Sequence, residues 1–251
     1  MIKLKTLKSL RLIPIILLFI VFVAGLYCSN KKSKNTFYNN KKAKLWAHRG
    51  LSINAPENSL ESIQAAFENG FKGVEIDLWF NKNTQSFHIH HDYSDSSKLT
   101  LNKIMNIYHD KDLKFWLDLK NLNQNNKNDI INNLNKLENT YHIKEKIIIE
   151  SPQASELNDV EKSGYFTSLY FKPVINTIFI IRFRNIILNL FHLCYYNYSA
   201  ASMPAGAYKG IIRYFCKNKN IHLWKQTKNK QDLNKWIMLP EVKIILFDGE
   251  L

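Results

Sequence analysis

The chain has 251 residues, of which 45% are hydrophobic, so it is long enough and apolar enough to bury one large core. Its net charge of +14 favours anionic partners such as lipid head groups or phosphate-bearing substrates. The sequence has no RNA-recognition signature and no zinc-finger spacing, so we expect no nucleic-acid partner.

The N-terminus has the pattern of a secretory signal or a short membrane anchor. Four basic residues precede an uncharged apolar run at residues 12–27, which is short for a bilayer-spanning helix. No small-residue cleavage site follows, so we prefer an anchor, in contact with the membrane through residues 12–27. A lipoprotein is disfavoured because Tyr27 directly precedes Cys28. We therefore expect residues 1–28 to be a signal or anchor segment, and the folded domain to be membrane-anchored or exported and to lie outside the cytoplasm.

Residues 29–42 are polar and lysine-rich and are predicted to be a basic linker, which leaves residues 43–251 for the folded domain. In that domain, apolar runs predict strands at residues 43–47, 72–77, 115–119, 146–150, 166–171, 198–202, 221–224 and 242–247. Helical patterns alternate with them at residues 59–69, 101–108, 128–138, 154–163, 208–217 and 231–238. This alternation predicts an α/β fold, a TIM-type (β/α)8 barrel preceded by an N-terminal hydrophobic helix.

His48, Arg49 and Gly50 follow the first predicted strand, and the C-terminal ends of barrel strands face the active side. Histidine can transfer protons near neutral pH, and arginine presents a planar fork to phosphate oxygens. Glycine lets a ligand approach the backbone. Taken alone, this tripeptide is a weak signal, for which a structural histidine is the preferred interpretation.

Charged residues end the second and third parallel strands. Glu75 and Asp77 are two residues apart, so both carboxylates point to one face of the strand. Apolar neighbours indicate that this segment is buried, where paired acids need a cation, and hard oxygen ligands favour Ca²⁺ or Mg²⁺. Asp118 and Lys120 share a face in the same way. Asp118 can complete the metal shell, and Lys120 can contact a phosphate.

An additional strand is predicted at residues 86–90. The turn before it is too short for a parallel crossover, so it should return as a hairpin at the barrel mouth. Three histidines lie there. We assign the chemistry to His91, at the strand end, with Asp92 orienting it or the adjacent loop. His88 and His90 are expected to pack or to form hydrogen bonds.

Residues 174–193 are strongly apolar but contain Arg182 and Arg184, which would be costly in the middle of a membrane span. Two interpretations remain open. The segment is either a barrel helix whose arginines extend to solvent or a helix that lies on a membrane surface.

Four ordered motifs resemble those of the glycerophosphodiester phosphodiesterase family, which belongs to the phosphatidylinositol phospholipase C-like barrels. They are Ala47-His48-Arg49-Gly50, Pro56-Glu57-Asn58-Ser59, Gly73-Val74-Glu75-Ile76-Asp77 and His91-Asp92. The resemblance implies a metal-dependent phosphoric diester hydrolase. The implied roles are acid–base catalysis for His48 and His91, binding of Ca²⁺ or Mg²⁺ for Glu75, Asp77 and Asp118, phosphate binding for Arg49 and Lys120, and supporting contacts for Glu57, Asn58 and Asp92.

Two features depart from the family pattern. Asp118 stands where the family usually has glutamate, and the segment after Asp92 is shorter than usual. We expect the substrate to be a glycerophosphodiester or a related lipid-derived phosphodiester. Two alternatives stay open: a phospholipase D-like or cyclic-phosphate-forming lyase of the same fold, and a catalytically silent barrel that binds phosphate or lipid. No oligomeric state is predicted.

Overall fold

The computed structural model describes residues 23, 37–38, 44–92, 98–171, 179–196, 198–224 and 233–251. Apart from Val23, the predicted signal or anchor segment lies outside these residues, as does most of the predicted linker. Among the helices that are described, none combines the length and the apolar character needed to cross a bilayer.

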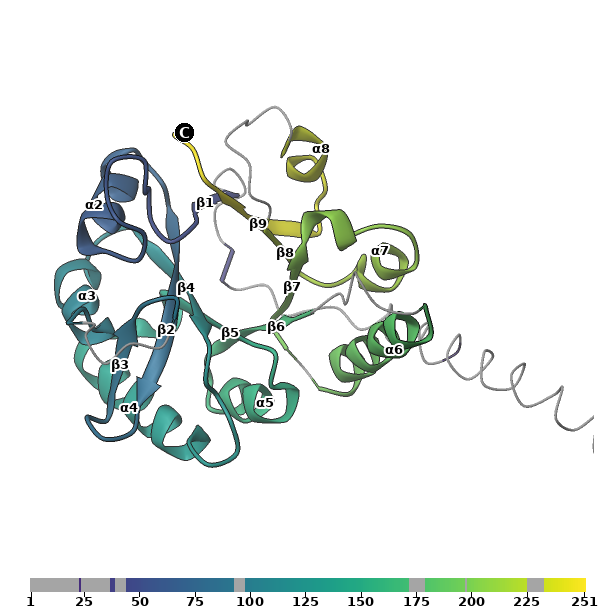
Figure 1. Cartoon of the computed structure of the whole chain (residues 1–251), viewed down its shortest axis with the longest axis horizontal. Coiled ribbons are helices and arrows are strands. Elements are labelled where there is room, and N and C mark those ends of the chain that lie inside the picture. Colours follow the sequence, from purple (N-terminus) through teal and green to yellow (C-terminus); the bar gives the residue numbers. More distant parts are fainter. Residues whose placement is uncertain are drawn as a thin grey trace, which may run out of the picture.

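Within the described residues, eight parallel strands close into a barrel (Figure 1). They are β1 (Leu45–Ala47), β2 (Gly73–Asn81), β4 (Lys114–Leu119), β5 (Ile147–Ser151), β6 (Phe166–Tyr170), β7 (Ala200–Pro204), β8 (Ile221–Trp224) and β9 (Val242–Phe247). The strands pair in chain order, and β1 closes the barrel by pairing with both β2 and β9. The predicted TIM-type barrel is confirmed.

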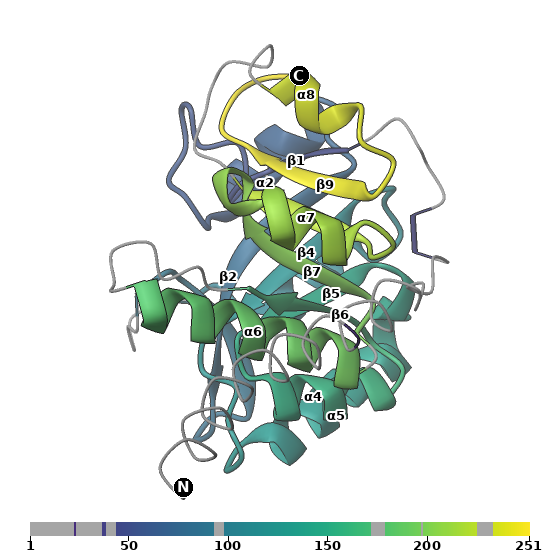
Figure 2. The same ribbon diagram turned by 90° about the vertical axis from the view of Figure 1, so that its right-hand side faces the viewer.

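Helices cover the outside of the barrel (Figures 1 and 2). They are α2 (Leu60–Glu68), α3 (Leu101–Tyr108), α4 (Lys127–Tyr141), α5 (Ala154–Lys162), α6 (Phe179–Tyr195), α7 (Gly210–Cys216) and α8 (Asn234–Ile237), with short 3₁₀ helices at Ile143–Glu145 and Ala205–Ala207. The first of them, α2, begins where the Ser59 hydroxyl accepts a hydrogen bond from the Ser62 N–H at 3.0 Å. Ile63 and Ala66 then lie on its buried face, against the barrel.

The apolar core has two layers because successive strand residues point to opposite faces. Val74 and Ile76 of β2 belong to the larger cluster, which joins the strands to the helices. A smaller cluster fills the barrel interior and contains Trp46, Trp116 and Leu246. The polar residues that alternate with the outer apolar positions of β2 therefore face the barrel axis.

Phe37 and Tyr38, which the sequence places in the predicted linker, are part of this interior cluster. The Phe37 ring lies 4.8 Å from that of Phe166, and the Lys114 ammonium lies 4.0 Å from its centroid. The Tyr38 hydroxyl forms a 2.5 Å hydrogen bond with His222 Nε2. Lys114 and Phe166 are the first residues of β4 and β6. Phe37 and Tyr38 therefore close the N-terminal end of the barrel. We call them the N-terminal plug.

Strand β2 runs to Asn81 rather than ending at Asp77, because it continues into an antiparallel pairing with β3 (Ser86–Ile89). The predicted hairpin is confirmed. It brings the chain back to the level of the barrel mouth, where the His90 N–H donates to the carbonyl of Asp77 at 3.2 Å.

Candidate active site

A cavity of about 350 Å³ lies at the C-terminal ends of the strands. Its lining includes all seven residues to which the sequence assigned catalysis, phosphate binding or metal binding, namely His48, Arg49, Glu75, Asp77, His91, Asp118 and Lys120. The other lining residues are Trp116, Glu150, Pro152, Tyr170, Trp224 and Leu246. The barrel therefore brings together side chains that are widely separated in the sequence.

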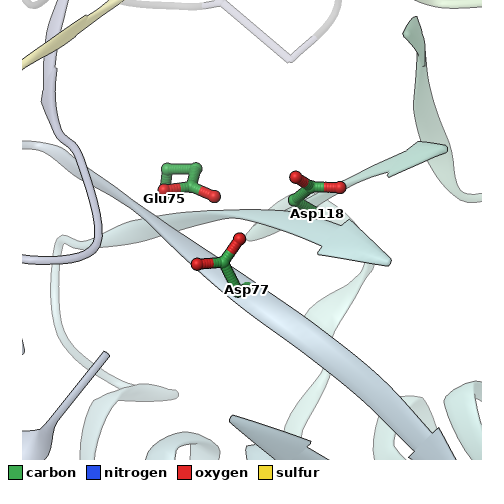
Figure 3. A group of neighbouring side chains, drawn as sticks. All are labelled: Glu75, Asp77 and Asp118. Atoms are coloured by element: carbon green, nitrogen blue, oxygen red, sulfur yellow. The ribbon is translucent and has the colours of Figure 1, made fainter. Parts of the chain in front are cut away.

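Glu75, Asp77 and Asp118 point toward one another at one side of this cavity (Figure 3). Each offers an oxygen within 4.8 Å of those of the other two. Strand geometry explains the cluster, because Asp77 and Asp118 are register partners and Glu75 lies two residues before Asp77. Burial and the neighbouring Asp77 charge raise the pKa of Glu75 to about 8. Three carboxylates at this spacing fit a divalent cation with oxygen ligands.

Lys120 contributes a positive charge directly to this acidic cluster. Its ammonium lies 2.6 Å from Asp77 Oδ1 and also contacts Asp118. Burial opposes the charged form, but Asp118 and Asp77 raise the pKa of Lys120 above its ordinary value. In the described structure Lys120 therefore neutralises part of the carboxylate charge.

Asp77 is held in place by the residues around the first predicted motif. The Asn58 side-chain amide donates to Asp77 Oδ2 at 2.7 Å, and its oxygen accepts from the Asp77 N–H at 2.9 Å. Arg49 Nε lies 3.0 Å from Asp77 Oδ2, and Arg49 Nη1 donates to Glu57 at 2.7 Å. The Arg49 N–H donates to Glu75 at 3.0 Å. Glu57 and Asn58 thus occupy supporting positions around the cluster.

The turn after β1 needs a glycine. Gly50 has a φ of +82°, and a Cβ there would lie 2.2 Å from Ser62 Oγ. Arg49 also has a positive φ, of 54°. This tight turn directs the Arg49 backbone N–H at Glu75 while the guanidinium reaches Asp77, so one residue contacts two of the three acids.

His48 is oriented by Asp248, which was not among the predicted site residues. Asp248 Oδ1 lies 2.8 Å from His48 Nδ1, and His48 Nε2 lies 3.9 Å from Glu75 Oε2. Burial works to lower the pKa of His48, but the hydrogen bond that the ring donates to Asp248 and the Glu75 charge outweigh it and raise the pKa. The signal for Asp248 was its position after the last strand, because a closed barrel places that strand beside the first.

His91 follows β3 at the cavity mouth, and its side chain is 49% exposed. Its Nδ1 lies 3.0 Å from Asp92 Oδ1, so Asp92 occupies the expected orienting position. The His91 carbonyl accepts a hydrogen bond from the Trp79 indole at 3.1 Å. His90 stacks on the Trp79 ring, and His88 is hydrogen-bonded to the Ser86 hydroxyl at 2.9 Å, as expected for packing histidines.

The other half of the barrel lines the cavity with residues that the sequence prediction did not include. Glu150 is the register partner of Asp118, and its pKa is raised by burial and by the Asp118 charge. The rings of Tyr170 and Trp224 are stacked, with centroids 6.0 Å apart and planes 10° apart. The cavity therefore has a charged half on β1, β2 and β4 and a more aromatic half on β6 and β8.

The model of the glycerophosphoryl diester phosphodiesterase family matches residues 48–166, which include both predicted catalytic histidines and all three clustered carboxylates. Residues 48–166 belong to the glycerophosphoryl diester phosphodiesterase family. Members of the family that residues 48–166 match are phosphoric diester hydrolases. Asp118, although shorter than the glutamate usual in that family, still reaches the acidic cluster.

Solved structures share the fold. A putative glycerophosphodiester phosphodiesterase from Galdieria sulphuraria is 18% identical with a TM-score of 0.63, covering 82% of this chain and 93% of that one. A glycerophosphodiester phosphodiesterase from Thermotoga maritima is 18% identical, with a TM-score of 0.61 and coverage of 82% and 94%. A phosphodiesterase from Oleispira antarctica, in complex with the product sn-glycerol-3-phosphate, is 15% identical, with a TM-score of 0.60 and coverage of 82% and 92%. No match to a curated protein was found.

Proposed function

We propose that this phosphodiesterase hydrolyses a glycerophosphodiester or a related lipid-derived phosphodiester by metal-dependent, two-histidine acid–base catalysis. The observation that carries the proposal is the meeting of an oriented histidine, a second histidine and three carboxylates in one cavity. The sn-glycerol-3-phosphate bound to the Oleispira antarctica phosphodiesterase supports a small glycerol-containing phosphodiester as the substrate.

Glu75, Asp77 and Asp118 would hold the divalent cation, either Ca²⁺ or Mg²⁺. The raised pKa of Glu75 supports this assignment, because a bound cation would offset its two main causes, burial and the neighbouring Asp77 charge. When bound, the cation would neutralise charge that develops on the phosphate oxygens. Arg49 and Lys120, which border the same cavity, would contact those oxygens directly.

His48 and His91 would divide the proton transfers. Because Asp248 binds Nδ1 of His48, the Nε2 atom of His48 would be the one that contacts the substrate. His91 reaches the cavity from the β3 side. One histidine would take the proton of the attacking water and the other would protonate the leaving alcohol. The phosphorus–oxygen bond to that alcohol breaks, and a phosphomonoester remains.

The test is the release of free alcohol from glycerophosphocholine and glycerophosphoethanolamine, with Ca²⁺, Mg²⁺ or a chelator present. We expect His48→Ala and His91→Ala each to lower turnover by roughly 100-fold or more. His109→Ala is the matched control, because His109 lies at the end of α3 and bonds the Met105 carbonyl, outside the cavity. Chelator should abolish turnover by the unsubstituted chain.

Four outcomes would contradict parts of the proposal. Full turnover in both histidine variants would exclude two-histidine catalysis, and activity indifferent to chelator would exclude the metal. A cyclic phosphate as the end product would identify the lyase alternative instead. Binding of inorganic phosphate without turnover of any phosphodiester would identify a silent barrel.

A further inference from the structure

Helices α6 and α7 carry an exposed apolar surface. Among the residues that the structure describes, eleven large hydrophobic side chains are exposed, and more than half of them lie on these two helices. They are Ile181, Leu188, Phe191, Tyr195, Ile211 and Tyr214. The two helices contact each other and lie side by side on the barrel (Figures 1 and 2). We call these six side chains the α6–α7 patch.

Packing against the barrel does not explain why these six side chains are apolar. Leu190 and Leu193 of α6 are buried against the core, which gives the helix the single apolar face that a barrel helix needs. Leu188, Phe191 and Tyr195 recur at intervals of three and four residues on another face, with Phe191 55% and Tyr195 68% exposed. The Phe191 and Tyr195 rings also stack at 5.6 Å, which makes a continuous aromatic surface.

The chain segment that carries the patch is basic. Residues 162–231 contain no aspartate and no glutamate. Arg184 is exposed between Ile181 and Leu188 on α6, and the Lys217 ammonium lies 5.2 Å from the Tyr214 ring on α7. Lys209 and Arg213 are exposed on the same stretch of α7, where Arg213 is 3.5 Å from Glu241 of a neighbouring segment. Exposed apolar side chains surrounded by cations match the chemistry of an anionic lipid surface.

We propose that the α6–α7 patch docks the barrel onto the surface of an anionic phospholipid bilayer. The apolar side chains enter the boundary between head groups and acyl chains, and the arginines and lysines contact anionic head groups. A second copy of the chain is a poorer occupant, because a twofold interface would place two basic surfaces against each other. The proposal concerns binding of the barrel and is independent of the reaction in the cavity.

The experiment must separate the patch from the apolar segment at residues 12–27. We therefore use full-length chains carrying Ile16→Asp, Phe19→Asp and Phe22→Asp, which remove the apolar character of that segment. Binding is measured by cosedimentation with vesicles of equal parts phosphatidylglycerol and phosphatidylcholine, and with vesicles of phosphatidylcholine alone. The chain should prefer the anionic vesicles, and added salt should weaken binding.

Two pairs of matched variants test the two components of the patch. Phe191→Ser with Tyr195→Ser should weaken binding to anionic vesicles at least tenfold, whereas Ile107→Ser with Met238→Ser removes exposed apolar side chains elsewhere and should have little effect. Arg184→Glu with Lys217→Glu should abolish the preference for anionic lipid. Lys82→Glu with Lys136→Glu makes the same change in net charge on other elements and should preserve that preference.

Equal binding by the patch variants and their controls would overturn the proposal, as would equal binding to both kinds of vesicle. A dimer in sedimentation velocity that Phe191→Ser with Tyr195→Ser converts to a monomer, with vesicle binding unchanged, would assign the patch to a second copy. Hydrolysis of soluble glycerophosphocholine should be unchanged in all four variant pairs, so failure of the docking proposal is distinguishable from failure of the proposed reaction.

Discussion

At the scale of single residues, the contact between His48 and Asp248 decides which imidazole nitrogen faces the cavity. The carboxylate holds Nδ1 at 2.8 Å, so Nε2 is directed toward Glu75 and the cavity. The same contact favours the protonated ring and helps to raise the pKa of His48 against the effect of burial. Orientation and proton affinity therefore depend on one side chain.

We predict that Asp248→Asn lowers kcat about tenfold or more and shifts the pH profile. The limb of the kcat/KM profile that belongs to His48 should move to lower pH, because burial still disfavours the charged ring once the carboxylate is gone. Asp112→Asn is the control, since exposed Asp112 pairs with Lys72 away from the cavity. A lower kcat with no movement of either limb would contradict the role given to Asp248.

Glu75 makes the stability of the metal-free protein depend on pH. Its pKa is raised from 4.5 to about 8 by burial and by Asp77, so the folded state holds a proton that the unfolded state has lost. The free energy of unfolding should then fall as pH rises from about 4.5 to about 8. With chelator present, we predict that Tm falls more steeply between pH 5 and pH 8 in the unsubstituted chain than in Glu75→Gln.

Thermal unfolding monitored by circular dichroism provides the comparison. Ca²⁺ or Mg²⁺ added at pH 8 should restore much of the lost Tm in the unsubstituted chain and less in Glu75→Gln. Parallel pH dependence in the two proteins would mean that Glu75 does not hold the extra proton.

The cavity residues that the sequence prediction included are those that belong to short local motifs. Alternation along β2 and β4 was enough to group Glu75, Asp77 and Asp118, and the structure places them together. Asp248 and Tyr170 were not predicted because neither has a local signal. They line the cavity only because the strands pair in a closed ring. A local sequence pattern does not reveal that pairing.

At the scale of secondary structure, prediction succeeded where the local signals agree. Helix α3 runs from Leu101 to Tyr108, as predicted, because Thr100 accepts a hydrogen bond from the Lys103 N–H and the apolar residues keep a helical period. Strand β2 extends beyond its predicted end at Asp77 because the antiparallel partner β3 supplies hydrogen bonds there. The pairing with β3 is a tertiary interaction. The apolar pattern of β2 alone therefore could not predict the length of β2.

Helix α4 ends at His142, which has a left-handed backbone with φ 53° and ψ 54°. Glycine adopts this conformation without steric cost and is preferred after helix ends. We predict that His142→Gly raises the free energy of unfolding by about 1 kcal/mol, measured by urea unfolding. His142→Ala keeps a Cβ and should give no such gain, so equal stabilisation by both substitutions would contradict a backbone origin.

At the scale of the whole molecule, the N-terminal plug extends the barrel beyond the boundary predicted at residue 43. The sequence placed Phe37 in a polar linker because its neighbours are lysines, asparagines and threonine. The structure buries its ring among interior residues of the closed barrel, with 3% of the residue exposed. Two adjacent aromatic residues, Phe37 and Tyr38, in an otherwise polar segment have no periodicity, so only the closed barrel reveals their partners.

We predict that Phe37→Ala lowers the free energy of unfolding by about 3 kcal/mol, since it removes a buried ring. The same substitution at exposed Phe191 should change it by about 0.5 kcal/mol or less. Urea unfolding of the three proteins provides the comparison. Equal effects at the two positions would show that the plug does not contribute to the stability of the barrel.

The contact between His48 and Asp248 joins residues 200 positions apart, from the first and last strands of the barrel. The proposed catalytic centre is therefore incomplete in any partly folded form in which these two strands have not yet paired. During refolding, recovery of turnover should follow the slowest step that unites the two strands, even if helix content and tryptophan fluorescence recover sooner. Recovery of turnover would then report when the barrel closes. Spectroscopic signals that are averaged over the whole chain do not report this step separately.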